Sequence, residues 1–135
     1  EYIEALGLWV FLRDNRLITK HQVEEMLASK GAKILVTDSD YVLGISDLPG
    51  EVNRYCINAI GKGDYRAVRN SLLFLRSLRE GINLLVSCGR IRHLHKKLGV
   101  LESSLEKTEK ACYSMSIRES EMIGISENKT VMAVD

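Results

Sequence analysis

Two pairs of acidic residues have a spacing that suits metal-assisted phosphodiester chemistry. Glu1 and Glu4 are three residues apart, and Asp47 and Glu51 are four apart, so each pair projects from one face of a helix. Carboxylates brought close together repel one another unless they are protonated, paired with cations or bound to a metal ion. A ligand set of oxygens without Cys or His suits Mg²⁺ or Mn²⁺, which polarise a phosphodiester and generate a hydroxide nucleophile.

The spacing of these acids also has a simpler explanation. Pairs of acids three or four residues apart are common on ordinary exposed helices, and spacing alone favours that interpretation. The sequence does not show that the two pairs meet. Arg54 follows Glu51 by three residues on the same stripe, so it either contacts a substrate phosphate or is the intrahelical partner of Glu51.

A basic run later in the chain is a second candidate for nucleic-acid contact. The net charge of +1 does not by itself predict such contact. The run could follow an RNA backbone, although runs of this kind are more often solvated helix faces. His93 and His95 cannot chelate one ion there, because residues two apart are separated by about 200° around a helix. The members of the run are Arg90, Arg92, His93, His95, Lys96 and Lys97.

Helices are the elements that must position these residues. Apolar residues recur at steps of three and four, and a single proline with few aromatic residues argues against a β-sandwich. Capping and turn residues divide the pattern into predicted helices over 1–14, 19–31, 38–60, 64–86 and 91–118, with caps at Thr19, at Asp38 or Ser39, and at Asp64. The last helix carries a heptad-like seam, which is either core within the chain or a subunit interface. The seam consists of Ile91, Leu94, Leu98, Leu101, Leu105, Thr108, Cys112 and Met115.

The sequence therefore predicts an all-α fold, an antiparallel helical bundle. We expect one domain over 1–121 and a disordered tail over 122–135. The helical pattern begins at Glu1 without a capping residue, so we expect further helices to precede this sequence in the native protein. Pro49 lies inside the third predicted helix, where it should kink the chain between Asp47 and Glu51 or make Asp47 the cap of a new helix.

Several segments resemble, in order, the translin-associated factor X (TRAX) branch of the translin family. They are residues 1–5, 17–18, 40–51, 54–58, 61–64 and 105–113. The resemblance implies a barrel-like hetero-oligomer with translin that holds RNA or single-stranded DNA. It also implies that Glu1, Glu4 and Asp47 are catalytic and bind the metal. Glu51 is a further acidic neighbour, which either binds the metal or supports the residues that do. Translin itself resembles this fold but lacks these acids, so their presence indicates the catalytic relative.

From this resemblance we expect a Mg²⁺-dependent endoribonuclease. Its substrates would be single-stranded or nicked small RNAs, such as the passenger strand in RNA interference. The alternative is a non-catalytic scaffold that binds translin and nucleic acid, with the acids as surface charge. A di-iron bundle is a weaker alternative, because it needs Glu-x-x-His pairs that the sequence lacks.

The cysteine content and hydropathy bear on where the protein works. Three cysteines without a CxxC pair indicate a reducing compartment, and the family resemblance implies both cytoplasm and nucleus. We predict no membrane-spanning segment, since no stretch of the sequence is long and apolar enough.

Overall fold

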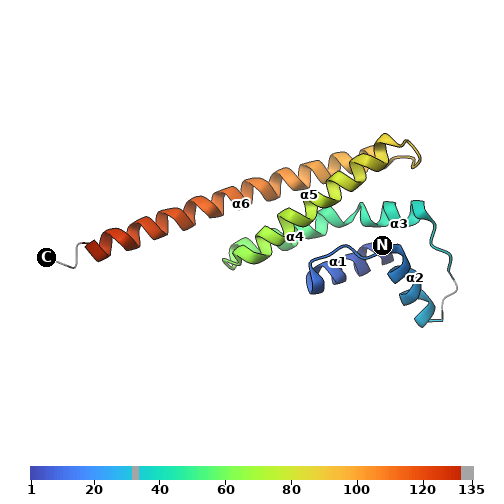
Figure 1. Ribbon diagram of the computed structural model, residues 1–135, viewed down its shortest axis with the longest axis horizontal. Coiled ribbons are helices and arrows are strands. Elements are labelled where there is room, and N and C mark those ends of the chain that lie inside the picture. The colour runs from blue at the N-terminus through green and yellow to red at the C-terminus, as the bar shows by residue number, and fades with distance from the viewer. Residues whose placement is uncertain (32–33, 132–135) are drawn as a thin grey trace.

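Six helices make up the regular structure of residues 1–31 and 34–131, the ranges that the computed structural model describes. They are α1 (Tyr2–Asp14), α2 (Lys20–Ser29), α3 (Asp38–Ile45), α4 (Leu48–Gly61), α5 (Tyr65–Ser87) and α6 (Leu94–Val131) (Figure 1). These ranges contain no strand, which confirms the all-α prediction. None of the helices described is long and apolar enough to cross a membrane.

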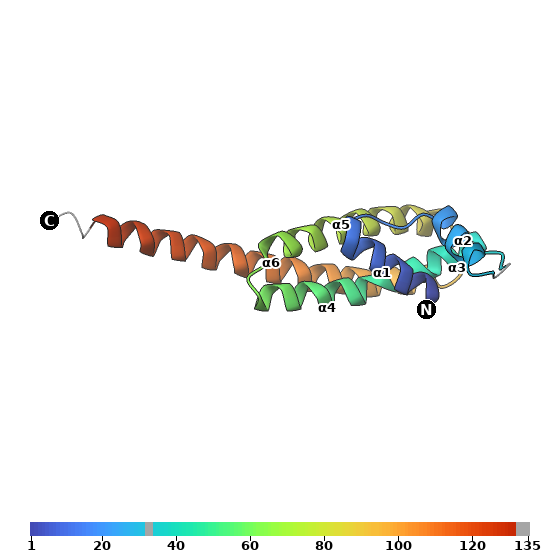
Figure 2. The same cartoon turned by 90° about the horizontal axis from the view of Figure 1, so that it is seen from below.

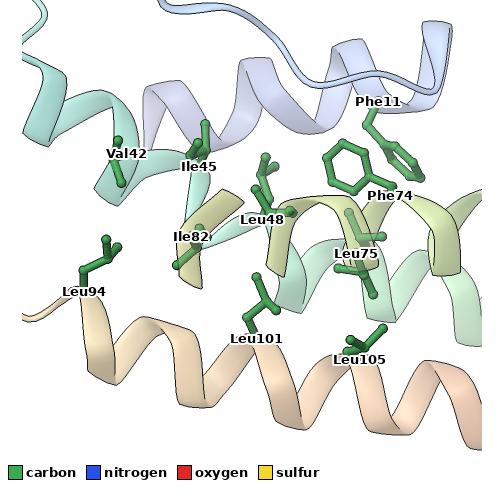
Figure 3. Packing of buried hydrophobic residues seen from close by; sticks show 12 residues of the cluster. Phe11, Val42, Ile45, Leu48, Phe74, Leu75, Ile82, Leu94, Leu101 and Leu105 are labelled. Atoms are coloured by element: carbon green, nitrogen blue, oxygen red, sulfur yellow. The ribbon is translucent and has the colours of Figure 1, made fainter. Parts of the chain in front are cut away.

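Helices α4, α5 and α6 pack against one another and form the main core. Consecutive helices run in opposite directions, and α6 extends well past the turn between α4 and α5 (Figures 1 and 2). Leu48, Leu75 and Leu101 are fully buried where the three helices meet (Figure 3). Burial of apolar area on this scale stabilises the bundle by about 2 kcal/mol for each large side chain.

The predicted heptad seam is core within the chain. Its buried members are Leu94, Leu101, Leu105, Thr108 and Met115. Its partly buried members are Ile91, Leu98 and Cys112. Because the seam faces α4 and α5, it is not a free stripe on the outside of α6.

Helix α1 packs on α3 and on the start of α4, and runs in the same direction as both. A Cβ atom added to Gly44 would lie 2.8 Å from Ile3 Cβ, and one added to Gly7 would lie 2.8 Å from Leu48 Cδ1. The contacting residues rise by four on both sides, from Ile3 to Gly7 and from Gly44 to Leu48, so the helices are parallel. The two glycines allow this close approach because they have no side chain.

The third predicted helix is two helices, so the prediction of one continuous helix over 38–60 was wrong. Thr37, rather than Asp38 or Ser39, caps α3 through a capping box: the Asp40 amide donates to Thr37 Oγ1 at 3.1 Å. Asp47 is the N-cap residue of α4, and Pro49 lies in the first turn. A proline is tolerated there because the first-turn N–H groups have no partner within the helix. Of the two expected effects of Pro49, the new helix cap is therefore the one observed.

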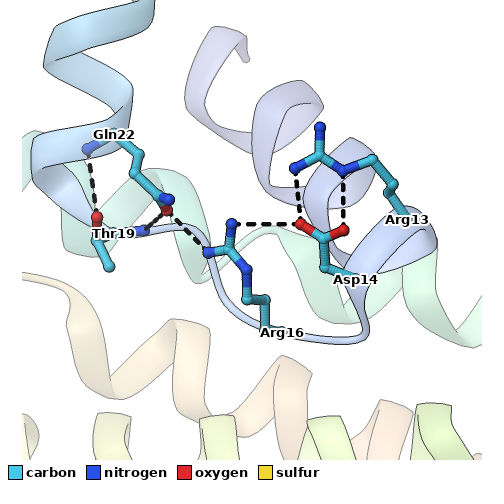
Figure 4. Close-up of polar contacts among 5 residues, drawn as sticks. All are labelled: Arg13, Asp14, Arg16, Thr19 and Gln22. Atoms are coloured by element: carbon cyan, nitrogen blue, oxygen red, sulfur yellow. Dashed lines mark hydrogen bonds and ion pairs between the residues drawn. The ribbon is translucent and has the colours of Figure 1, made fainter.

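Other predicted helix ends are confirmed. Thr19 and Gln22 form the predicted capping box, in which the Gln22 amide donates to Thr19 Oγ1 at 3.2 Å (Figure 4). Asp64 caps α5, since its Oδ1 accepts from the Ala67 amide at 3.0 Å.

The two ends of α6 differ from the sequence-based expectation. The helix begins at Leu94 rather than at Ile91, after a loop with positive φ at Gly89 and His93. It continues to Val131, through most of the segment expected to be a disordered tail. Residues 132–135 lie outside the described residues. The division into a domain over 1–121 and a tail stays a prediction.

Candidate functional site

The packing of α1 brings one acidic segment beside the other. Glu1 is exposed at the start of α1 and Glu4 is partly buried one turn later. The helix that carries them lies against the junction of α3 and α4, where Asp47 is the cap residue. In the part of the chain that the structure describes, however, no three His, Cys, Asp or Glu side chains converge closely enough to hold a metal ion. The segments are adjacent, but the predicted cluster of acids is not assembled.

Asp47 instead forms an ion pair with Lys97 of α6. The Lys97 ammonium donates to Asp47 Oδ1. The Asp47 side chain is 43% exposed and the Lys97 side chain is 36% exposed, so water screens the pair only in part. Asp47 is also the N-cap residue of α4, at the positive end of the helix dipole. Neighbouring acids need protonation, a paired cation or a bound metal ion, and for Asp47 the structure shows a paired cation.

Glu51 pairs with Arg54 within α4. The Arg54 guanidinium lies 3.1 Å from Glu51 Oε1, one helical turn away. This is the intrahelical partnership that the sequence left open as one of two roles for Arg54. The Arg54 side chain is 73% exposed, and an exposed pair of this kind contributes at most about 0.5 kcal/mol. Breaking the ion pair with Glu51 would therefore cost little free energy. That Arg54 binds a phosphate stays a prediction.

The basic run forms the loop before α6 and its first turn. Arg90, Arg92, His93, His95 and Lys96 are exposed, as expected for a solvated face. Lys97 is partly buried and differs from the other members.

Lys97 is the site residue whose role the sequence analysis missed. In the sequence it belongs to the run expected to form a solvated face. It also lies three residues after Leu94 and four before Leu101. That spacing places Lys97 beside the buried seam of α6, and it is the signal that distinguishes Lys97 from the exposed members of the run.

The comparisons with known proteins agree with this architecture. A family model described as "Translin family" matches residues 1–119. The chain belongs to the translin family. It is 32% identical over 90% of its length to Translin-associated protein X of Rattus norvegicus and of Mus musculus. It is 29% identical, again over 90% of its length, to the Translin-associated protein X homolog of Schizosaccharomyces pombe.

The match to the translin family confirms the resemblance inferred from the motifs. The matched range contains α1, the α3–α4 junction and the basic run, so every candidate site residue lies inside it. The chain covers 49% of the two mammalian relatives and 50% of the yeast one. It thus spans about half the length of the curated relatives it matches.

Proposed function

We propose that this translin-family chain is an RNA-cleaving subunit of a hetero-oligomer with translin, and that its activity depends on Mg²⁺ or Mn²⁺. The name of its mammalian relatives, Translin-associated protein X, supports translin as the partner. The observation that carries the catalytic part is the parallel packing of α1 on the α3–α4 junction. This packing sets Glu1 and Glu4 on the helix that lies beside Asp47.

The donor chemistry of these acids fits a hard divalent ion. Glu1, Glu4 and Asp47 would hold it, with Glu51 as a further ligand, since all four offer only carboxylate oxygens. When bound, Mg²⁺ or Mn²⁺ supplies positive charge that polarises a phosphodiester. Asp47 could bind the ion only after its ion pair with Lys97 is broken. The exposed Arg54 is placed one turn from Glu51 and would bind a phosphate through two parallel hydrogen bonds.

The alternative function is a non-catalytic subunit that binds translin and nucleic acid. It is favoured by the cation pairing of Asp47 and Glu51, and by the lack of a three-acid cluster among the residues described. Under this alternative the acids serve only as surface charge, and Asp47 in addition links the start of α4 to α6 through its ion pair with Lys97.

Cleavage of a labelled single-stranded RNA distinguishes the two functions. The protein is purified with translin and assayed with Mg²⁺, with Mn²⁺ and with EDTA. We expect cleavage only with the metal, and we expect Asp47→Asn to abolish it while assembly is kept. Asp64→Asn is the matched control, because Asp64 is also an acid at a helix N-cap and Asn caps equally well. A complex that assembles and binds RNA but never cuts it would support the scaffold alternative.

We also propose, from the family resemblance, that the protein works in both cytoplasm and nucleus. Fluorescence microscopy of the tagged protein in its own cells tests this. Strict confinement to one compartment would contradict it.

A further inference from the structure

Two cysteines face each other across neighbouring helices, Cys56 on α4 and Cys112 on α6. The two helices run in the same direction, since α5 between them runs the opposite way (Figures 1 and 2). Thr108 Oγ1 donates to Asn53 Oδ1 at 3.1 Å, and this hydrogen bond fixes the register between the helices. Cys112 follows Thr108 by four residues and Cys56 follows Asn53 by three, so one further helical turn brings the cysteines level.

Both cysteines belong to one packed group of side chains. Cys112 packs against a cluster whose buried members are Cys56, Ala59, Ala67, Val68 and Met115. The two sulfurs influence each other there. Burial raises the pKa of the Cys56 thiol, and the nearby Cys112 thiolate raises it further. A disulfide needs Cβ atoms about 3.5 to 4.5 Å apart, a distance that short side chains reach when they face each other between packed helices.

The two thiols differ in their access to solvent. Cys56 is 0% exposed, whereas Cys112 is only partly buried and lines a groove of about 340 Å³ between α5 and α6. This groove is large beside the roughly 30 Å³ that one water molecule occupies, so a small oxidant has room to reach Cys112. The third cysteine, Cys88, is exposed at the C-terminal end of α5, next to the loop that precedes α6.

We propose that Cys56 and Cys112 are a redox-modification site, in which hydrogen peroxide links them by a disulfide that joins α4 to α6. The Cys112 thiolate attacks one peroxide oxygen and becomes a sulfenic acid, while the other oxygen leaves as hydroxide and takes up the proton that Cys112 had released. The Cys56 sulfur then attacks the Cys112 sulfur, and the sulfenic hydroxyl leaves with the Cys56 proton as a second water. Peroxide is reduced, both thiols are oxidised, and a dithiol reductant reverses the bond.

Peptide mapping of the wild-type protein tests the pairing without any variant. The full protein is purified in the reduced form and treated with hydrogen peroxide under native conditions. The remaining thiols are blocked with N-ethylmaleimide before digestion without reductant. Trypsin places the three cysteines in separate peptides, residues 55–62, 80–90 and 111–118. We expect peptides 55–62 and 111–118 to appear joined, at a mass two hydrogens below their sum, and to separate when dithiothreitol is added.

Three variants test the order of the steps. Cys56→Ala should leave Cys112 as a sulfenic acid, which dimedone labels, because the thiol that closes the bond is gone. In Cys112→Ala, Cys56 should stay reduced, since it is fully buried and has no oxidised partner. Cys88→Ala is the matched control and should form the bond as the wild type does.

Urea unfolding measures the consequence for the bundle. The disulfide should lower the equilibrium constant of unfolding by about 30-fold or more, because it closes a long loop of the chain. Dithiothreitol should restore the original value. Peroxide should not stabilise Cys112→Ala in this way. A joined protein that unfolds as readily as the reduced one would show that the bond forms only in an opened bundle, and this would overturn the inference.

Three results of the peptide mapping would also overturn it. One is a joined pair that includes peptide 80–90 in place of peptide 55–62 or 111–118. Another is a Cys56 that stays reduced after Cys112 has become a sulfenic acid. The third is an equal yield of the bond in denaturing urea, because pairing would then not depend on the packing of α4 on α6.

Discussion

Replacing Gly44 with alanine tests the docking of α1, the helix that carries Glu1 and Glu4. The added Cβ would lie 2.8 Å from Ile3 Cβ and 2.9 Å from Ile3 Cγ2. Real Cβ atoms essentially never approach so closely, and Ile3 cannot turn away because its branched Cβ is itself the contacting atom. Helix α1 must therefore shift outward from α3.

The expected loss of stability follows from two opposing effects. Overpacking of this kind costs about 1 to 3 kcal/mol, while alanine in place of glycine inside a helix returns up to about 1 kcal/mol. We expect a net loss of about 1 to 2 kcal/mol. Gly81→Ala is the matched control, because Gly81 also lies within a helix but an added Cβ there meets nothing within 4 Å. That variant should gain about 0.5 to 1 kcal/mol.

Urea unfolding followed by circular dichroism measures both changes, and hydrogen exchange locates them. In Gly44→Ala the amides of α1 should exchange faster than in the wild type, whereas those of α5 should change less. Stabilisation of Gly44→Ala as large as that of Gly81→Ala, with the amides of α1 still protected, would refute this close packing. In that case Ile3 would not press on α3, and the parallel docking of the acidic helix would lose its main support.

Three further predictions concern packing, a hydrogen bond and thiol reactivity. Leu101→Ala should lower the free energy of unfolding by about 2 to 5 kcal/mol because the side chain is fully buried, whereas the exposed control Val100→Ala should change it by less than about 1 kcal/mol. Tyr41→Phe removes the hydroxyl that donates to the Ile18 carbonyl at 2.6 Å, and should cost about 1 to 2 kcal/mol in the same urea assay; an unchanged midpoint would contradict this. Burial raises the pKa of the Cys56 thiol, so iodoacetamide at mildly alkaline pH should label the exposed Cys88 much faster, as peptide mass spectrometry would show; equal rates would contradict the packing.

The features that the sequence predicted well are local ones. The caps at Thr19 and Asp64 depend on side chains within three residues of the amides they bind. The seam of α6 depends on a repeat that continues over several turns, and such repeats specify a buried face whatever covers it.

The boundaries that the sequence missed depend on backbone geometry that periodicity does not express. Ile91 fits the seam, yet α6 begins at Leu94 because His93 adopts a positive φ value, which a right-handed helix does not permit. The break at Asp47 was anticipated from Pro49, but only as one of two outcomes, because a proline can kink a helix or begin one.

The sequence by itself determined the helical fold, the translin-family membership and the identity of the acids. Only the tertiary structure decided the partners of those acids. Asp47 pairs with Lys97, which lies 50 residues later in the chain, and α1 lies parallel to α3 and α4, the helices on either side of Asp47. Such contacts depend on the register between packed helices, which is set by how Leu48, Leu94 and Leu101 fill the core together. Spacing along the chain places a residue on a face of its own helix, but it does not specify which residue of another helix lies opposite.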